Sequence, residues 1–321
     1  MAETLSSPKR KYKPFSILIE WENVLLSGNS RANIMLSRVI EQANKIEECI
    51  ELIISANTHQ PSLLHRPRNL QPQINWKLLI NPECHYYELK NKAASVAKGE
   101  IIIFVDSDVI PDSQWLTNIL QGFEDPSVMV SCGKAWIDHD SLYSKAFALF
   151  WFFPLKDKIG LIEKPKLQKV NHFFANNVAF NKDLFLKYGF ISDEKASRGG
   201  CLFLAEKLME DNIDIIMCEE ALVAHPPPQP GAHFVMRALA QGRDKILRSR
   251  NFKKNIGFSL YRLVQNSCKA SVKIVLRHRH VELPLIQAPA AIVLALTYYA
   301  LYFIGEVLTL VHFKPIYKIS I

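Results

Sequence analysis

Short apolar runs alternate with amphipathic stretches along most of the chain. The runs have strand length and are rich in Ile, Val and Phe, whereas apolar residues between them recur every three or four positions. This alternation predicts a largely parallel sheet flanked by helices. The expected strands are Phe15–Glu20, Ile50–Ile54, Ile74–Ile80, Ile101–Val105, Val128–Ser131, Val178–Phe180 and Ile213–Met217. The expected helices are Arg31–Ile46, Tyr87–Ala97, Pro111–Phe123, Leu202–Glu210 and Phe234–Ser249.

The run Ile101–Val105 is apolar at every position and is followed by Asp106 and Asp108. A strand that is apolar on both faces lies inside a sheet covered by helices. Because an unpaired buried charge is costly, the two acids must lie just past the strand end, where ligands bind in open α/β sheets. Two carboxylates there suit a divalent cation that holds a phosphate. Alternatively, Asp106 caps the next helix and Asp108 is a solvated loop residue.

The C-terminal part has a different pattern. No charged residue occurs from Pro284 to Gly305, and Ala290–Ile304 is almost wholly apolar. A helix of about 20 such residues spans a bilayer. Basic residues are concentrated upstream of this stretch, which places the N-terminal part in the cytoplasm if the helix spans. We therefore expect association with the cytoplasmic face of the cell membrane, by a single-pass helix or by one that lies on the surface. A helix buried in the protein is the alternative.

Composition narrows the partners. The chain has 321 residues, is 49% hydrophobic and carries 39 Lys and Arg against 31 Asp and Glu, a net charge of +8. A basic surface suits an anionic partner. There is no zinc pattern, RNP-like run or helix-turn-helix, so no nucleic acid is expected. The six cysteines are scattered without close pairs, as in a chain with reduced thiols, and the polar start of the chain is not a secretory signal.

Four blocks, in this order, resemble the family 2 glycosyltransferases. They are Lys90–Ala93 with Ala97–Glu100, Phe104–Asp108, Phe174–Phe180 with Gly189–Phe190, and Ala221–His225. The resemblance covers Phe15 to Arg248. It implies a GT-A type doubly wound mixed sheet flanked by helices, here followed by the apolar C-terminal helix. The expected organisation is a polar tail at 1–14, a glycosyltransferase domain at 15–250, a basic linker helix region at 251–282, a membrane-associated or transmembrane helix at 283–312 and a tail at 313–321.

The resemblance implies binding of a nucleoside-diphosphate sugar and inverting transfer of the sugar to a hydroxyl acceptor, in polysaccharide or glycolipid synthesis. The acceptor would be a glycan or a lipid-linked glycan. Asp106 and Asp108 would hold Mg²⁺ or Mn²⁺ against the two phosphates, and that cation would stabilise the leaving group. His225 is the candidate third ligand. The alternative for His225 is a turn histidine that hydrogen-bonds the backbone.

The nucleotide is expected to meet residues of the helix before the acidic strand. Lys90 or Lys92 would contact the pyrophosphate as a point charge, unless both lie on a solvated helix face. Asn91 would hydrogen-bond the nucleotide or the acidic loop, unless it caps the helix.

The first strand departs from the family pattern, since it ends in Glu20-Trp21-Glu22. Two acids and an indole would suit a base and a ribose, with Trp21 stacking and Glu22 accepting from hydroxyls. The alternative is that Trp21 belongs to the core.

The acceptor side departs further. Gly200 and Cys201 stand where the family has carboxylates. Because inverting transfer requires a group that takes the acceptor's proton, Asp193 and Glu194 are the candidate bases, unless they are a solvated loop pair. This departure also motivates a second hypothesis, a catalytically silent relative that binds a sugar nucleotide or a partner enzyme. A metal-dependent phosphohydrolase is a third.

Overall fold

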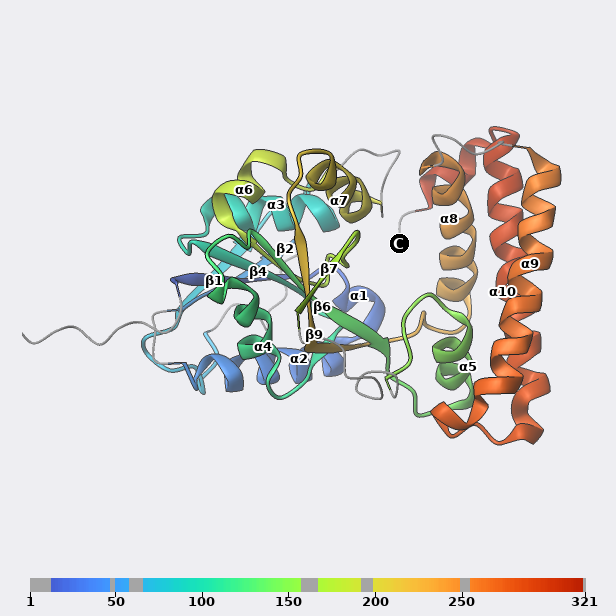
Figure 1. Cartoon of the computed structure of the whole chain (residues 1–321), viewed down its shortest axis with the longest axis horizontal. Helices are drawn as coiled ribbons and strands as arrows, with labels where there is room; N and C mark the ends of the chain where they lie inside the picture. The colour runs from blue at the N-terminus through green and yellow to red at the C-terminus, as the bar shows by residue number, and fades with distance from the viewer. Residues whose placement is uncertain are drawn as a thin grey trace, which may run out of the picture.

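The sheet is mixed and forms the centre of the molecule (Figure 1). The computed structural model describes residues 13–46, 50–57, 66–156, 167–191, 199–248 and 255–319. Within these ranges the sheet has nine strands, in the order β3-β2-β1-β4-β8-β6-β9-β5, with β7 paired to β9. The strands are β1 Phe15–Glu20, β2 Ile50–Ala56, β3 Asn75–Ile80, β4 Ile101–Asp106, β5 Ile110–Pro111, β6 Val130–Ile137, β7 Leu167–Val170, β8 Asn177–Asn181 and β9 Ile215–His225.

The first half of the sheet, β3-β2-β1-β4, is parallel, and the acidic strand β4 lies in the middle of the whole sheet. Strand β1 pairs in parallel with β2 and with β4, in a register that sets Glu20 opposite Asp106. Strand β8 then pairs antiparallel with both β4 and β6. Every residue of β1, β2 and β4 is buried, as expected for strands covered on both faces. The expectation of a mixed, doubly wound sheet is confirmed.

Helices cover both faces. Helices α3 (Tyr86–Val96), α6 (Lys182–Tyr188) and α7 (Gly200–Glu210) lie on one face, and α2 (Asn29–Ala43) and α4 (Trp115–Gln121) lie on the other, with the short α1 (Val24–Ser27) next to α2 (Figure 1). Each face has its own hydrophobic core.

A helical layer stands at one end of the sheet (Figure 1). It contains α5 (Leu142–Phe150), α8 (Ala232–Arg248), α9 (Ile256–Arg277) and α10 (Ala288–Leu310). The aromatic run after Leu142 packs here, since Phe147 lies 5.6 Å from the ring of Tyr298, and the indole of Trp151 donates to the Tyr298 hydroxyl at 3.1 Å. The helical layer therefore shares a core with one face of the sheet.

Several expected boundaries are wrong; the strand expected at Val128–Ser131, for example, is β6 and runs from Val130 to Ile137. Pro111 does not begin a helix, because Ile110–Pro111 pairs with β9 as a short strand and α4 begins only at Trp115. The strand expected to end at Met217 continues to His225. Charged residues interrupt its apolar pattern at Glu219 and Glu220, and Glu219 is neutralised by an ion pair with Lys134 on β6.

Candidate functional site

Two carboxylates end neighbouring strands beneath the site. Asp106 is the last residue of β4 and is 3% exposed; Glu20 is the last residue of β1 and is 1% exposed. Parallel pairing brings the two strand ends together. Such a pair in a dry environment requires hydrogen bonds, a counter-charge or a proton.

Asp106 has both hydrogen bonds and a counter-charge. Its Oδ1 pairs with the ammonium of Lys90, and its Oδ2 accepts from the Tyr86 hydroxyl at 2.6 Å and from Asn23 Nδ2 at 3.3 Å. Lys90 is itself only 1% exposed and also donates to the carbonyl of Ala175 at 3.1 Å. The solvated alternative for Lys90 is therefore wrong, whereas Lys92 lies on the exposed side of α3. A resident cation already neutralises Asp106.

Glu20 is stabilised in this dry environment by protonation of its carboxyl. Burial raises the pKa of this carboxyl from 4.5 to about 8, and the charges of Asp106 and Asp108 add to the rise, against the opposite effect of Lys90. Its Oε2 accepts from the backbone N–H groups of Glu22 and Asn23, at 3.0 and 3.4 Å. Glu20 thus fixes the turn after β1 from below, and it is buried rather than set in the cavity wall.

Asp108 lies beyond the strand, in the wall of a small cavity that His225 and Asn23 also line. His225 ends β9, and its Nδ1 donates to the carbonyl of Pro226 at 2.6 Å. In the neutral ring that bond leaves the Nε2 lone pair as the ligand atom. The ring also packs against Trp151 and Phe153, with centroids 5.9 and 4.9 Å away. A backbone hydrogen bond through Nδ1 and metal ligation through Nε2 are therefore compatible in His225.

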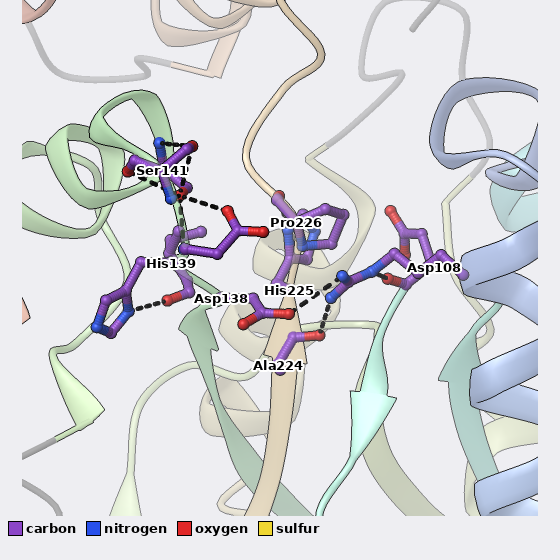
Figure 2. Close-up of polar contacts among 11 residues, drawn as sticks. Asp108, Asp138, His139, Ser141, Ala224, His225 and Pro226 are labelled. Carbon is purple, nitrogen blue, oxygen red and sulfur yellow. Dashed lines mark hydrogen bonds and ion pairs between the residues drawn. The ribbon is translucent and has the colours of Figure 1, made fainter.

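Arg31 joins the segments that carry these two residues. From α2, its Nε donates to the carbonyl of Asp108, its Nη2 donates to the carbonyl of Ala224 at 2.9 Å, and its Nη1 pairs with Asp138 at 3.2 Å. The ends of β4, β6 and β9 come together around this guanidinium, and Figure 2 shows Asp108, Asp138 and Ala224 converging beside His225. The functional contacts of Arg31 were not predicted, because no local pattern distinguishes one arginine near the start of an amphipathic helix.

A larger cavity of about 430 Å³ begins at Asp106 and reaches the helical layer. Tyr86 and Asn23 line it near the acid, and His225 and Cys201 also contribute to its wall. Aromatic side chains of the segments 150–153 and 173–174 form much of the remaining wall, together with residues of α8, α9 and α10. Its size is that of a small-molecule site. The ion pair of Asp106 therefore lies next to open space.

The other predicted nucleotide contacts have structural partners. Asn91 donates to the carbonyl of Phe190 at 2.8 Å and accepts from its N–H at 3.0 Å, so it pins the chain after α6 and caps no helix. Glu22 accepts from Asn57 at 3.1 Å and contacts the ring of His85 at 3.0 Å, which raises the pKa of His85. Trp21 is buried in the core, so the stacking role is wrong.

The candidate bases Asp193 and Glu194 lie outside the described residues. Cys201, at the start of α7, is buried, and burial raises the pKa of its thiol. A protonated thiol does not accept a proton from an acceptor, so Cys201 does not replace the missing carboxylate.

Only some of these side chains suit a divalent cation. Over the described ranges, no three His, Cys, Asp or Glu side chains gather as a metal-binding group. Asp106 does not fit as it stands, because its oxygens are engaged by Lys90, Tyr86 and Asn23. Asp108 and His225 do fit by donor type and by the cavity they share.

Fold and site together define the class: a mixed α/β sheet with acids at its strand ends and a cavity above them. Residues 87–189 match the model of glycosyl transferase family 2. The chain has the GT-A fold of these enzymes, and the resemblance to family 2 glycosyltransferases is confirmed.

Two solved structures share the fold. The mannosyltransferase PcManGT from Pyrobaculum calidifontis, in complex with GDP-Man and Mn²⁺, is 17% identical with a TM-score of 0.57, over 97% of this chain and 90% of that one. TarS from S. aureus, in complex with UDP-GlcNAc, is 13% identical with a TM-score of 0.50, over 92% of this chain and 91% of that one. A search of curated protein sequences gives no match.

Proposed function

We propose that the protein transfers a sugar from a nucleoside-diphosphate sugar to a hydroxyl acceptor, with inversion at the anomeric carbon. The observation that carries this proposal is Asp106, which ends β4 beside a cavity of about 430 Å³ that reaches the helical layer, with Asp108 in the wall of a smaller cavity that shares Asn23 and His225 with it. The similar PcManGT and TarS structures hold GDP-Man and UDP-GlcNAc, which supports a nucleotide-sugar donor.

In this reaction the acceptor oxygen forms a bond to the anomeric carbon as the bond from that carbon to the phosphate oxygen breaks. The electron pair leaves with the nucleoside diphosphate, and the acceptor's proton passes to a base. Asp108 and His225 would hold Mg²⁺ or Mn²⁺, and Asp106, the third member of the predicted set, would join them only after giving up its ion pair with Lys90. Such a cation, when bound, stabilises the charge that develops on the leaving diphosphate. Lys90 holds Asp106 in place through their ion pair.

The base remains a prediction. Asp193 and Glu194 are the nearest carboxylates in sequence before α7, and Cys201 does not take their role. If these residues act as the base, Glu194→Gln or Asp193→Asn abolishes transfer while donor binding is kept.

The test compares sugar-nucleotide turnover with Mn²⁺ for the wild-type protein, Asp108→Ala and the control Asp183→Ala. Asp183 is an exposed acid on α6, far from the cavity lining. We expect Asp108→Ala to lose turnover on the order of a hundredfold or more, and Asp183→Ala to keep it. Equal turnover in all three proteins would refute the role of Asp108.

The missing acceptor-side carboxylates favour one other function, a catalytically silent relative that binds a sugar nucleotide or a partner enzyme. Calorimetry separates the two. Donor binding by the wild-type protein without turnover on any glycan or lipid-linked acceptor supports the silent relative, and turnover that depends on Glu194 contradicts it.

We also propose that the protein works at the cytoplasmic face of a membrane, on a polysaccharide or glycolipid. Within the described residues one helical segment, Leu285–Leu310, is long and apolar enough to cross a bilayer. The acceptor would then be presented at the membrane, next to the helical layer that lines the cavity.

A further inference from the structure

The outward face of α9 is apolar over its whole length. Exposed apolar side chains recur along the helix, and at about 100° per residue they fall within about 200° of its circumference. They are Ile256, Leu260, Val264, Val272, Val275 and Leu276. Leu276 is 73% exposed, far more than a side chain that serves the core of the protein. No described segment of the chain covers this face.

Basic residues follow the apolar face along one flank. Lys273 and Arg277 come directly after Val272 and Leu276, which sets them about 100° around the helix, and Lys269 lies one turn before Lys273 on the same flank. Helix α9 contains no Asp or Glu. An apolar side flanked by cations is the pattern of a helix that lies in the interface of an anionic bilayer.

Helix α10 packs beside α9 and also exposes apolar side chains. The turn before it exposes Ile286 by 88%, and the helix exposes Val293 by 62% and also Leu296 and Ile304. Its one charged residue, Glu306, is fully buried and accepts from Arg262 of α9 at 2.9 Å. The ion pair holds the two helices together and removes the charge from their outer side.

Helix α10 is held too firmly on α8 to cross a membrane alone. At Gly242 of α8, an added Cβ would lie 2.0 Å from the carbonyl oxygen of Tyr302, and at Gly305 of α10 it would lie 2.1 Å from that of Leu239. The two backbones are therefore in contact. Because α8 carries Arg237, Arg243, Asp244, Lys245 and Arg248, a spanning α10 would either lose α8 or take these charges into the hydrocarbon.

We infer that α9 and α10 form a docking face that lies flat on an anionic lipid surface, with no segment crossing it. This inference deepens the proposed membrane role: lipid binding stands without it, and only the purpose of that binding rests on the proposed function. The inner sides of the same helices line the cavity through Asn266, Tyr298 and Tyr302. Docking thus brings the cavity wall to the height of the lipid headgroups, where an acceptor attached to a lipid is presented.

Charge decides between a bilayer and a second copy of the chain. In a two-fold dimer the same face meets itself, and α9 brings no acid of its own to offset Lys269 and Arg277. Anionic headgroups supply that missing charge. The lipid surface is therefore the occupant that this face fits.

Sedimentation with vesicles tests the inference, using phosphatidylcholine alone and phosphatidylcholine mixed with phosphatidylglycerol. We expect binding to the mixed vesicles and much weaker binding to the neutral ones. The variant Leu260→Glu/Val264→Glu should bind at least about tenfold more weakly, because each change removes one buried side chain from the lipid. The control Leu186→Glu/Met209→Glu changes two exposed apolar residues on α6 and α7 and should bind like the wild-type protein.

Three further results bear on the inference. Release of the bound protein by alkaline carbonate supports a flat helix pair, and retention until detergent is added would overturn it. A stable dimer in solution that Leu260→Glu/Val264→Glu dissociates would assign the face to a second copy instead. Asp108→Ala should bind vesicles normally, so a failure of lipid binding and a failure of catalysis are seen separately.

Discussion

Protonation of Glu20 makes a specific prediction about stability. In the folded protein the pKa of this carboxyl is about 8, whereas in the unfolded chain it returns to about 4.5. Between these values the folded state holds a proton that the unfolded state releases. The free energy of unfolding therefore falls as pH rises from about 5 to about 8. Since one pKa unit is worth 1.36 kcal/mol, the loss is on the order of 4 kcal/mol.

The substitution Glu20→Gln removes this pH dependence. The amide is neutral, and its oxygen can still accept from the backbone N–H groups of residues 22 and 23. We expect the variant to be close to the wild-type protein near pH 5 and more stable near pH 8. The loss is a large part of a domain stability of roughly 5–15 kcal/mol, so it should be easily measured.

Urea unfolding of the full chain in the presence of a chelator, at several pH values from about 5 to about 8.5, measures the effect. The control Glu41→Gln changes an exposed acid on α2, and its pKa is lowered by a hydrogen bond from Lys45, so it stays ionised across this range. The control should follow the wild-type curve. Parallel curves for wild type and Glu20→Gln over the whole range would refute the reasoning, since they would show that Glu20 is already ionised when buried.

Three other substitutions test the contacts around the site. Arg31→Met removes hydrogen bonds that join three strand ends, so urea unfolding should show a loss of roughly 1–3 kcal/mol, and the Mn²⁺ concentration needed for half-maximal turnover should rise. Lys90→Met leaves Asp106 buried without a counter-charge and should cost about 3–5 kcal/mol; adding Asp106→Asn should restore most of it, and no recovery in the double variant would contradict the pairing. Gly305→Leu forces α10 away from α8 and should lower the melting temperature, whereas the same change at the exposed Ala300 should not.

The strands and helices were largely predictable, because the spacing of apolar residues in the sequence follows from which side chains are buried in the fold. The run Ile101–Val105 is apolar on both sides and is buried on both sides, and the amphipathic stretch after it in the chain is a helix that covers the sheet. The errors fall where a long-range partner changes the local preference. Pro111 starts helices well, yet here it pairs with Val223, more than a hundred residues later.

The site was predictable in its acids but not in its counter-charges. Asp106 and Asp108 could be found because two carboxylates after a buried strand require an explanation. Arg31 could not, since its partners Asp108, Asp138 and Ala224 are 77, 107 and 193 residues away. No local pattern carries that information. Lys90 was found as a cation near the site, but its pairing with Asp106 could be seen only in the fold.

The distribution of charge separates the three acids by role. The charge of Asp106 is balanced by Lys90, and Glu20 is neutral because it holds a proton. The protein itself therefore neutralises both strand-end carboxyls. Asp108 lies past the strand, in a cavity wall shared with His225. Using Asp106 as a ligand requires displacing Lys90, whereas Asp108 lies beside His225 and takes no part in that ion pair. For this reason Asp108, rather than its better-buried neighbour, is the acid whose loss should most directly weaken cation-dependent turnover.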